Sequence, residues 1–274
     1  TGQSSAYIFR HCKNFVVSCS LSFRSFPFLA WTNMTSSAFA GRFAAFMSTI
    51  VNLQTFPVAT GYLILVFLSP LWRRLVRPFQ LNMVMVVYNF FCSSLSLYTV
   101  VRCVIVFVRS MDLFDMTNYQ DLKHPLFVYW LTKWIELFDT VLMILRHKER
   151  QISFLHVYHH CSVLMLSDLA YHNYQWPPVA FVLCMNSFVH VFLYLYYGQS
   201  ALFPGQRPVW KKRLTQLQIV QFLVGFAHVT YGYIYHGFCI YGPFYCLSML
   251  LLFSNFYYHA FVRRKSEGNR KKAN

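Results

Sequence analysis

Long apolar segments recur along most of this chain and constrain its fold more than any other feature. A segment of about 20 apolar residues crosses the hydrocarbon core of a bilayer as an α-helix, and a helix satisfies its own backbone in lipid. The sequence therefore predicts an all-α, polytopic membrane protein, a helical bundle with seven transmembrane helices. The seven segments are 55–72, 81–108, 125–145, 152–170, 177–197, 214–235 and 241–262.

Composition agrees with a lipid environment. Only 12% of the 274 residues are charged and 57% are hydrophobic, whereas soluble domains carry about 25% charged residues. The net charge of +16 would suggest nucleic acid as a partner of a soluble protein. No soluble basic domain is present to hold it, so we expect the basic residues to mark cytoplasmic loops and to attract anionic substrates or headgroups.

Lysine and arginine gather in alternate connections, which predicts the orientation of the chain. The second connection balances two basic residues with three acidic ones, and the fourth and sixth have no basic residue. Because cytoplasmic loops are rich in Lys and Arg, the remaining connections and the tail are expected in the cytosol. Their basic residues are Arg73, Arg74, Arg77, Arg146, Lys148, Arg150, Arg207, Lys211, Lys212 and Arg213, followed by Arg263, Arg264, Lys265, Arg270, Lys271 and Lys272.

Two short motifs agree with this orientation. Asn33-Met34-Thr35 is an N-glycosylation sequon, which is used in the lumen. Lys271 and Lys272 form a dilysine near the C-terminus, an endoplasmic-reticulum retrieval signal that is read in the cytosol. We therefore expect a multi-pass protein of the endoplasmic reticulum membrane. It would comprise a luminal N-terminal segment (1–54), a catalytic membrane domain (55–262) and a basic cytosolic tail (263–274).

Polar side chains interrupt four of the apolar segments, each along one helix face. Ionisable residues are costly in a bilayer and mark functional sites by default. Counted from the cytosolic ends of their segments, Asp139, His159, His190 and Gln221 lie roughly 9 to 12 Å deep. This common depth predicts one pocket that opens toward the basic loops and continues as an apolar acyl tunnel. Its residues are Lys133, Glu136, Asp139, Thr140, His156, His159, His160, Asn186, His190, Tyr194, Tyr197, Thr215, Gln218 and Gln221.

Purely structural roles are the alternative for parts of this set. Lys133 and Glu136 could form a salt bridge that only holds helices together, and Gln218 and Gln221 could be polar contacts between helices. A single histidine in a helix is more often a satisfied core residue. Three imidazoles within an arc of about 100° on one helix favour a site. The cysteines form no CxxC pair, so no metal site is predicted from their spacing.

These motifs, in this order, resemble the four signatures of the ELO family of very-long-chain fatty acid elongases (3-oxoacyl-CoA synthases). The resemblance covers residues 55–262, and Leu193 stands where Met is common. It implies condensation of a long acyl-CoA with malonyl-CoA to 3-oxoacyl-CoA, CO₂ and CoA, without a cofactor. The motifs are Lys133-x-x-Glu136-x-x-Asp139-Thr140, His156-x-x-His159-His160, Asn186-x3-His190-x3-Tyr194-x-Tyr196-Tyr197 and Thr215-x-x-Gln218-x-x-Gln221.

The resemblance also implies partners. These are the 3-ketoacyl-CoA reductase, the dehydratase and the enoyl reductase that complete the elongation cycle, and other elongase subunits in a homo- or hetero-oligomer. Gln151 and the box from Leu155 to His160 are similar to the form seen in the polyunsaturated-acid branch of the family. We therefore expect a preference for polyunsaturated fatty acid substrates.

We assign chemical roles from the properties of the side chains. Histidine supplies a nucleophile or base near neutral pH without a metal, so His159 is expected to form an acyl-imidazole, with His190 as the second choice. Glu136 and Asp139 would orient ring N–H groups. Amide donors stabilise developing oxyanions, a role expected for Asn186 and Gln218. The substrate-binding set is Lys133, Thr140, Tyr194, Tyr197, Thr215, Gln218 and Gln221.

One disulfide is conceivable on the luminal side. Cys103 lies near the luminal end of its segment, and Cys239 lies in the connection between the last two segments. The lumen is oxidising, so the two could bond. Two unrelated thiols are the alternative that the sequence leaves open.

Two other protein classes share single features with this chain. A membrane di-iron fatty acid desaturase or hydroxylase also uses a His-x-x-His-His box, but it needs several boxes to hold two irons, and this chain has one. A seven-span receptor would share the topology, but it has no need for a histidine box and an Asp at one depth. The elongase interpretation accounts for all four motifs together.

Overall fold

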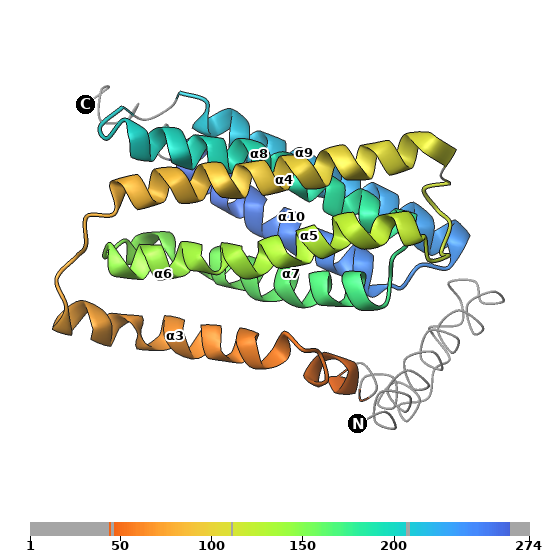
Figure 1. Ribbon diagram of the computed structural model, residues 1–274, viewed down its shortest axis with the longest axis horizontal. Coiled ribbons are helices and arrows are strands. Elements are labelled where there is room, and N and C mark those ends of the chain that lie inside the picture. The colour runs from red at the N-terminus through yellow and green to blue at the C-terminus, as the bar shows by residue number, and fades with distance from the viewer. Residues whose placement is uncertain (1–43, 45–46, 111, 207–208, 264–274) are drawn as a thin grey trace.

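The computed structural model describes residues 44, 47–110, 112–206 and 209–263. These residues form long helices that run side by side along the length of the molecule, with no strand among them (Figure 1). The all-α prediction is confirmed. The helices are α3 (Phe56–Leu75), α4 (Asn82–Ser110), α5 (Gln120–Glu136), α6 (Phe138–Leu145), α7 (Phe154–His172), α8 (Pro177–Leu202), α9 (Lys211–His236) and α10 (Tyr241–Tyr257), with a short 3₁₀ turn η2 (Glu149–Gln151) and a π-helical turn η3 (Tyr258–Arg263).

Among the described residues, five helical segments are long and apolar enough to cross a membrane: α3, α4, α8, α9 and α10 extended by η3. The other two segments predicted to span the membrane differ from these. Residues 125–145 are divided between α5 and α6, which are 17 and 8 residues long. Helix α7 is less apolar because it carries the histidine box and Asp168. The protein is polytopic, and the count of seven transmembrane helices stays a prediction.

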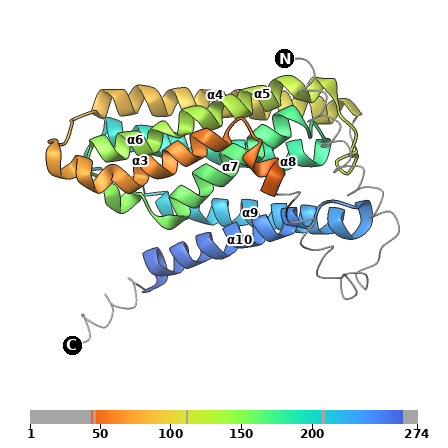
Figure 2. The same ribbon diagram turned by 90° about the horizontal axis from the view of Figure 1, so that it is seen from below.

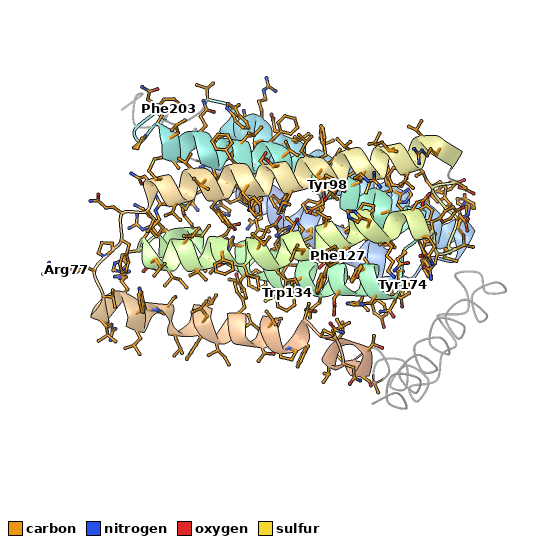
Figure 3. The ribbon with its side chains drawn as sticks, viewed as in Figure 1. Arg77, Tyr98, Phe127, Trp134, Tyr174 and Phe203 are labelled. Carbon is orange, nitrogen blue, oxygen red and sulfur yellow. The ribbon has the colours of Figure 1, made fainter. Side chains whose placement is uncertain are left out.

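Successive helices alternate in direction, except that α6 continues in the direction of α5, so the basic connections meet at one end of the bundle (Figure 1). The C-terminal ends of α3, α6 and α8 lie beside the N-terminal ends of α4, α7 and α9 (Figure 1). Arg77 and Phe203 lie at this end, and Tyr174 lies at the opposite one (Figure 3). The described arginines and lysines of the predicted cytosolic connections are therefore brought together in space.

Helices α4 and α8 pack closely because α4 presents small and polar side chains to α8. Small residues let helices in lipid approach each other. The Ser93 hydroxyl donates to the Val191 carbonyl at 3.1 Å, and a Cβ added at Gly198 would lie 3.4 Å from Phe90. The buried polar and thiol residues of α4 are Asn89, Cys92, Ser93, Ser96, Thr99 and Cys103.

Cys103 decides between the two alternatives left open for the luminal cysteines. Its side chain is fully buried in α4 as a free thiol, so the bond to Cys239 is absent. The thiol instead forms a side-chain hydrogen bond with Cys184 of α8. Of the two alternatives that the sequence left open, the structure has the unbonded thiols, because Cys103 lies on the face of α4 that packs on α8.

Helix α3 lies at the edge of the bundle, against α6 and α7 (Figure 2). Its first backbone N–H groups lack partners within the helix, and Asp168 of α7 supplies one. Asp168 Oδ2 accepts from the Thr55 hydroxyl at 3.2 Å and from the Thr55 backbone N–H at 3.4 Å. His172 Nε2 lies 3.4 Å from the other carboxylate oxygen. Asp168, an ionisable residue that the sequence analysis did not single out, thus anchors α3.

The connection from α6 to α7 fixes the ends of the two helices that carry Asp139, Thr140 and the histidine box. Helix α6 ends in a Schellman motif, in which Lys148 N–H donates to the Met143 carbonyl at 2.8 Å and His147 has a φ of 54°. After η2, the Ser153 side chain caps α7 by accepting from the His156 N–H at 3.3 Å. The first turn of α7 therefore begins directly before the histidine box.

A break between α5 and α6 falls inside the predicted site. Around Leu137 the backbone makes short-range bonds, from Leu137 N–H to the Trp134 carbonyl at 3.3 Å and from Thr140 N–H to the Leu137 carbonyl at 3.2 Å. Such turns within a helix often mark functional positions. The Ile135 carbonyl accepts instead from the Tyr88 hydroxyl at 3.1 Å.

Candidate active site

A buried ion pair on α5 forms the centre of the site. Lys133 Nζ donates to both oxygens of Glu136, at 2.8 and 2.9 Å, and the two side chains are 3% and 1% exposed. Glu136 Oε1 also lies 3.0 Å from His190 Nδ1 on α8. The pair is more than an internal salt bridge of one helix, because its carboxylate contacts a histidine of another.

The contact with Glu136 sets the tautomer of His190. A carboxylate only accepts hydrogen bonds, so Nδ1 carries the proton, and in the neutral ring Nε2 keeps a lone pair. Lys133 Nζ lies 3.4 Å from the same Nδ1, which adds a positive charge beside the ring. The lone pair of Nε2 can therefore accept a proton or attack a carbon atom.

The histidine box divides between two sides of α7. His159 stacks on His190, with ring centroids 5.8 Å apart and planes at 28°. His156 and His160, one turn apart, pack together at 4.3 Å, and His156 Nε2 lies 2.8 Å from Thr140 Oγ1. The Thr140 hydroxyl in turn lies 3.0 Å from the hydroxyl of Tyr62 on α3. His159 therefore faces α8, and the other two histidines face α3 and α6.

Asp139 does not orient a histidine, contrary to the expectation. It accepts instead from the Tyr194 hydroxyl at 2.8 Å, because one helical turn on α8 separates Tyr194 from His190. Of the two acidic residues, only Glu136 contacts an imidazole. Tyr197, further along α8, packs against Tyr194 and is 38% exposed.

Asn186 is fixed in the site by a tyrosine. The Tyr129 hydroxyl donates to Asn186 Oδ1 at 2.9 Å, and both residues are buried. Asn186 lies one turn before His190 on α8, so its amide is close to the level of the imidazole. This arrangement fits the expected role of an amide donor.

The polar residues of α9 are less connected to the others. Thr215 and Gln221 are buried and Gln218 is half-buried. The Thr215 hydroxyl donates to the Lys211 carbonyl of its own helix at 3.3 Å. Among the described residues, no hydrogen bond joins these three side chains to the histidines. Their substrate contacts stay predictions, and so does the oxyanion role of Gln218.

The structure adds two tyrosines that the sequence analysis missed. Tyr129 lies four residues before Lys133 and seven before Glu136 on α5, so helical spacing could have identified it. Tyr62 lies in an apolar segment without ionisable neighbours, and only its contact with Thr140 reveals it. Of the other predicted positions, Asn33, Lys271 and Lys272 lie outside the described residues.

The site brings together three imidazoles, one carboxylate that contacts His190, and the side-chain amide of Asn186. It joins α5, α6, α7 and α8, and Tyr62 of α3 contacts it through Thr140. Within the described part of the chain, no three or more His, Cys, Asp or Glu side chains are grouped so that they could hold a metal ion. These groups can perform acyl transfer by nucleophilic and general acid–base catalysis.

Comparisons with known proteins agree on one family. Residues 28–269 match the family described as ELO: GNS1/SUR4 family. The chain is 34% identical over 239 residues to very long chain fatty acid elongase 4 of Mus musculus, an alignment that covers 80% of this chain and 75% of the relative. Very long chain fatty acid elongase 1 of Homo sapiens is 37% identical over 218 residues, with 69% and 74% covered. Very long chain fatty acid elongase 5 of Homo sapiens is 34% identical over 236 residues, with 80% and 77% covered. The chain belongs to the ELO family.

Proposed function

We propose that this protein is a fatty acid elongase that condenses long-chain acyl-CoA with malonyl-CoA through an acyl-imidazole on His159. The observation that carries the proposal is the Glu136–His190–His159 arrangement, in which an oriented imidazole stacks on a second one. The relatives named as very long chain fatty acid elongases 1, 4 and 5 support the same activity. The protein is a 3-oxoacyl-CoA synthase, an acyltransferase.

The first half of the reaction loads the acyl group. A ring nitrogen of His159 attacks the thioester carbonyl, the C–S bond breaks, and the acyl carbon becomes bonded to nitrogen. His190 Nε2 takes the proton that the His159 ring loses and passes it to the CoA thiolate. Division into two steps makes each of them easier. Asn186 Nδ2 donates to the carbonyl oxygen of the thioester, which becomes negative in the tetrahedral intermediate.

The second half forms the new carbon–carbon bond. Malonyl-CoA loses CO₂, and the electron pair of the broken bond leaves an enolate. The enolate carbon attacks the acyl carbon, the C–N bond breaks, and His159 regains a proton. Each turnover consumes one proton. It releases one 3-oxoacyl-CoA, one CO₂ and one CoA. The residues supply every group that these steps require, so we expect no cofactor and no metal.

The two ends of the substrate suit two parts of the bundle. The CoA portion is a polyphosphate, and clustered arginines and lysines attract such groups. The acyl chain is apolar and suits a tunnel between helices. The basic end of the bundle, with Arg77 of the α3–α4 connection (Figure 3), supports binding of CoA there.

We further propose that the protein resides in the endoplasmic reticulum membrane with the partners that complete the cycle. These are a 3-ketoacyl-CoA reductase, a dehydratase and an enoyl reductase, and the protein itself would assemble as a homo- or hetero-oligomer. The charge distribution supports a membrane orientation with the basic connections in the cytosol. The basic end of the bundle would face the cytosol, where acyl-CoA is available.

A malonyl-CoA assay tests the proposed activity. Purified protein in lipid is given [2-¹⁴C]malonyl-CoA and long-chain acyl-CoA, labelled 3-oxoacyl-CoA is measured, and CO₂, which leaves from the unlabelled free carboxyl carbon, is measured separately. Both products are expected, in equal amounts, and EDTA should leave the rate unchanged. Release of CO₂ that does not depend on acyl-CoA, or no labelled product, would exclude a condensing enzyme. Iron in the purified protein would point instead to a di-iron desaturase or hydroxylase.

Substrate unsaturation is the subject of a further prediction. Polyunsaturated acyl-CoAs are expected to turn over faster than saturated ones of the same length, because the box around His159 is similar to that of the polyunsaturated-acid branch. The measurement compares kcat/KM for 18- and 20-carbon acyl-CoAs with zero to five double bonds. Equal or faster turnover of the saturated members would overturn this assignment.

Membrane orientation gives another prediction. Protein made in a eukaryotic host should shift in mobility after glycosidase treatment, and the variant Asn33→Gln should not. A tag at the C-terminus should be digested by protease added outside sealed microsomes, because the tail is expected in the cytosol. A protected tag would reverse the orientation, and the basic end of the bundle would then face the lumen.

A further inference from the structure

Tyr129 is a buried tyrosine that the mechanism above does not use. It lies on α5, one turn before Lys133, and is 2% exposed. Its hydroxyl donates to Asn186 Oδ1 at 2.9 Å. Lys133 Nζ lies over its ring, 4.7 Å from the centroid. Tyr129 thus touches two members of the site, one through its hydroxyl and one through its ring.

The contacts of Tyr129 complete a closed set of bonds between α5 and α8. On α5, Tyr129 is followed by the Lys133–Glu136 pair. On α8, Asn186 is followed one turn later by His190, which Glu136 contacts at 3.0 Å. The two helices are therefore tied at two successive levels. Two such ties resist both sliding and rotation of one helix against the other, which a single hydrogen bond would not.

The hydroxyl of Tyr129 also decides how the Asn186 amide is turned. Since the hydroxyl donates to Oδ1, the two N–H donors of Nδ2 point away from Tyr129. Without this bond the amide could turn over with little change in shape, because its oxygen and nitrogen are nearly the same size. A donor stabilises a transition state only when it is already aimed at the developing charge.

We infer that Tyr129 is a positioning residue whose hydroxyl holds the Asn186 amide with Nδ2 toward the substrate oxyanion. Its ring supports Lys133 at the same time, and so keeps the Glu136 carboxylate beside His190. The inference rests on the proposed function and on the role of Asn186 within it. The two parts of Tyr129 have different roles: the hydroxyl acts on catalysis through Asn186, and the ring acts on Lys133.

The test compares two phenylalanine variants. Tyr129→Phe keeps the ring and its contact with Lys133 but removes the hydroxyl. Its kcat for malonyl-dependent CO₂ release should fall about tenfold with KM within about twofold, because the oxyanion donor is present but no longer held. The matched control, Tyr245→Phe, removes the α10 hydroxyl that lies 3.1 Å from Ser162 Oγ and should keep its kcat.

A double-mutant cycle shows whether the hydroxyl acts through Asn186. Asn186→Ala should lower kcat about 10²-fold, as loss of one oxyanion donor does. Tyr129→Phe combined with Asn186→Ala should then be no slower than Asn186→Ala alone, since no amide remains to be positioned. A merely structural role would instead give two effects that multiply. Rates are expressed per acyl-loaded site, so that poorly folded protein does not count.

Several outcomes would overturn the inference. One is a kcat of Tyr129→Phe equal to that of Tyr245→Phe, and another is a full tenfold loss in the Asn186→Ala background. If Tyr129→Phe does not fold, the Asn186→Ala variant alone decides. An unchanged kcat of Asn186→Ala would show that the Asn186 amide is not an oxyanion donor, and Tyr129 would then have no donor to position. A wild-type protein that releases no CO₂ from malonyl-CoA would defeat the proposed function itself.

Discussion

Replacement of His159 by alanine should abolish acyl loading. Wild-type protein given long-chain acyl-CoA alone, without malonyl-CoA, should release one CoA per active site and gain the mass of the acyl group on His159. In His159→Ala both signals should fall at least about 10³-fold, as expected when a nucleophile is removed. Mass spectrometry of the intact protein and of its peptides measures the adduct, and a thiol reagent measures the CoA.

The control for this experiment is a histidine outside the site. His124 on α5 is exposed and lies 3.3 Å from the Tyr98 hydroxyl, so His124→Ala should load acyl groups at the wild-type rate. Normal loading of His159→Ala would show that His159 is not the nucleophile. An acyl mass on His190 would transfer the role to that residue, whose tautomer Glu136 fixes.

Replacement of Glu136 by alanine should destabilise the protein and inactivate it. The change leaves Lys133 as an unpaired charge in a buried position, which lowers the free energy of unfolding by roughly 3–5 kcal/mol. It also removes the acceptor that keeps the proton on His190 Nδ1. Thermal unfolding in detergent or lipid measures the first effect, and CO₂ release per folded molecule measures the second.

A second variant separates these two effects. Lys133→Met combined with Glu136→Leu removes both charges and should restore most of the lost stability, because well-packed apolar residues often replace a buried ion pair without cost. Activity should stay absent, since nothing then orients His190. For comparison, Glu149→Ala breaks a contact of 3.9 Å with the exposed Arg73 and should change stability by less than about 1 kcal/mol. A stable and active Glu136→Ala would refute the role of this carboxylate.

Much of the fold could be read from the sequence, because helix formation in lipid depends on local composition. The apolar segments 177–197 and 241–262 begin where α8 and α10 begin. The break at Leu137 was not predicted, because Leu137 is an ordinary helix-forming residue in an apolar stretch. Short-range bonds to Trp134 and from Thr140 produce it, and the sequence alone carries no signal for them.

The sequence also identified most residues of the candidate site, since ionisable and amide side chains are conspicuous among apolar ones. It placed Glu136, His159 and His190 in one cluster, and the structure joins them. What it could not give was their pairing. It assigned Asp139 to a histidine, whereas Asp139 accepts from Tyr194. Glu136 and Asp139 are three residues apart, so they contact residues on successive turns of α8, His190 and Tyr194.

Only the tertiary structure decided which histidine is oriented and showed that Tyr62 and Tyr129 belong to the site. Helical periodicity says which side chains share a face of one helix, but not which face of another helix they meet. That depends on how α5 packs on α8 and α3 on α6 and α7. Tyr129 is distinguished in the sequence only by its spacing from Lys133 and Glu136, and Tyr62 looks like an ordinary membrane aromatic. They become part of the site because packing brings their hydroxyls to Asn186 and Thr140, where a buried polar atom needs a partner.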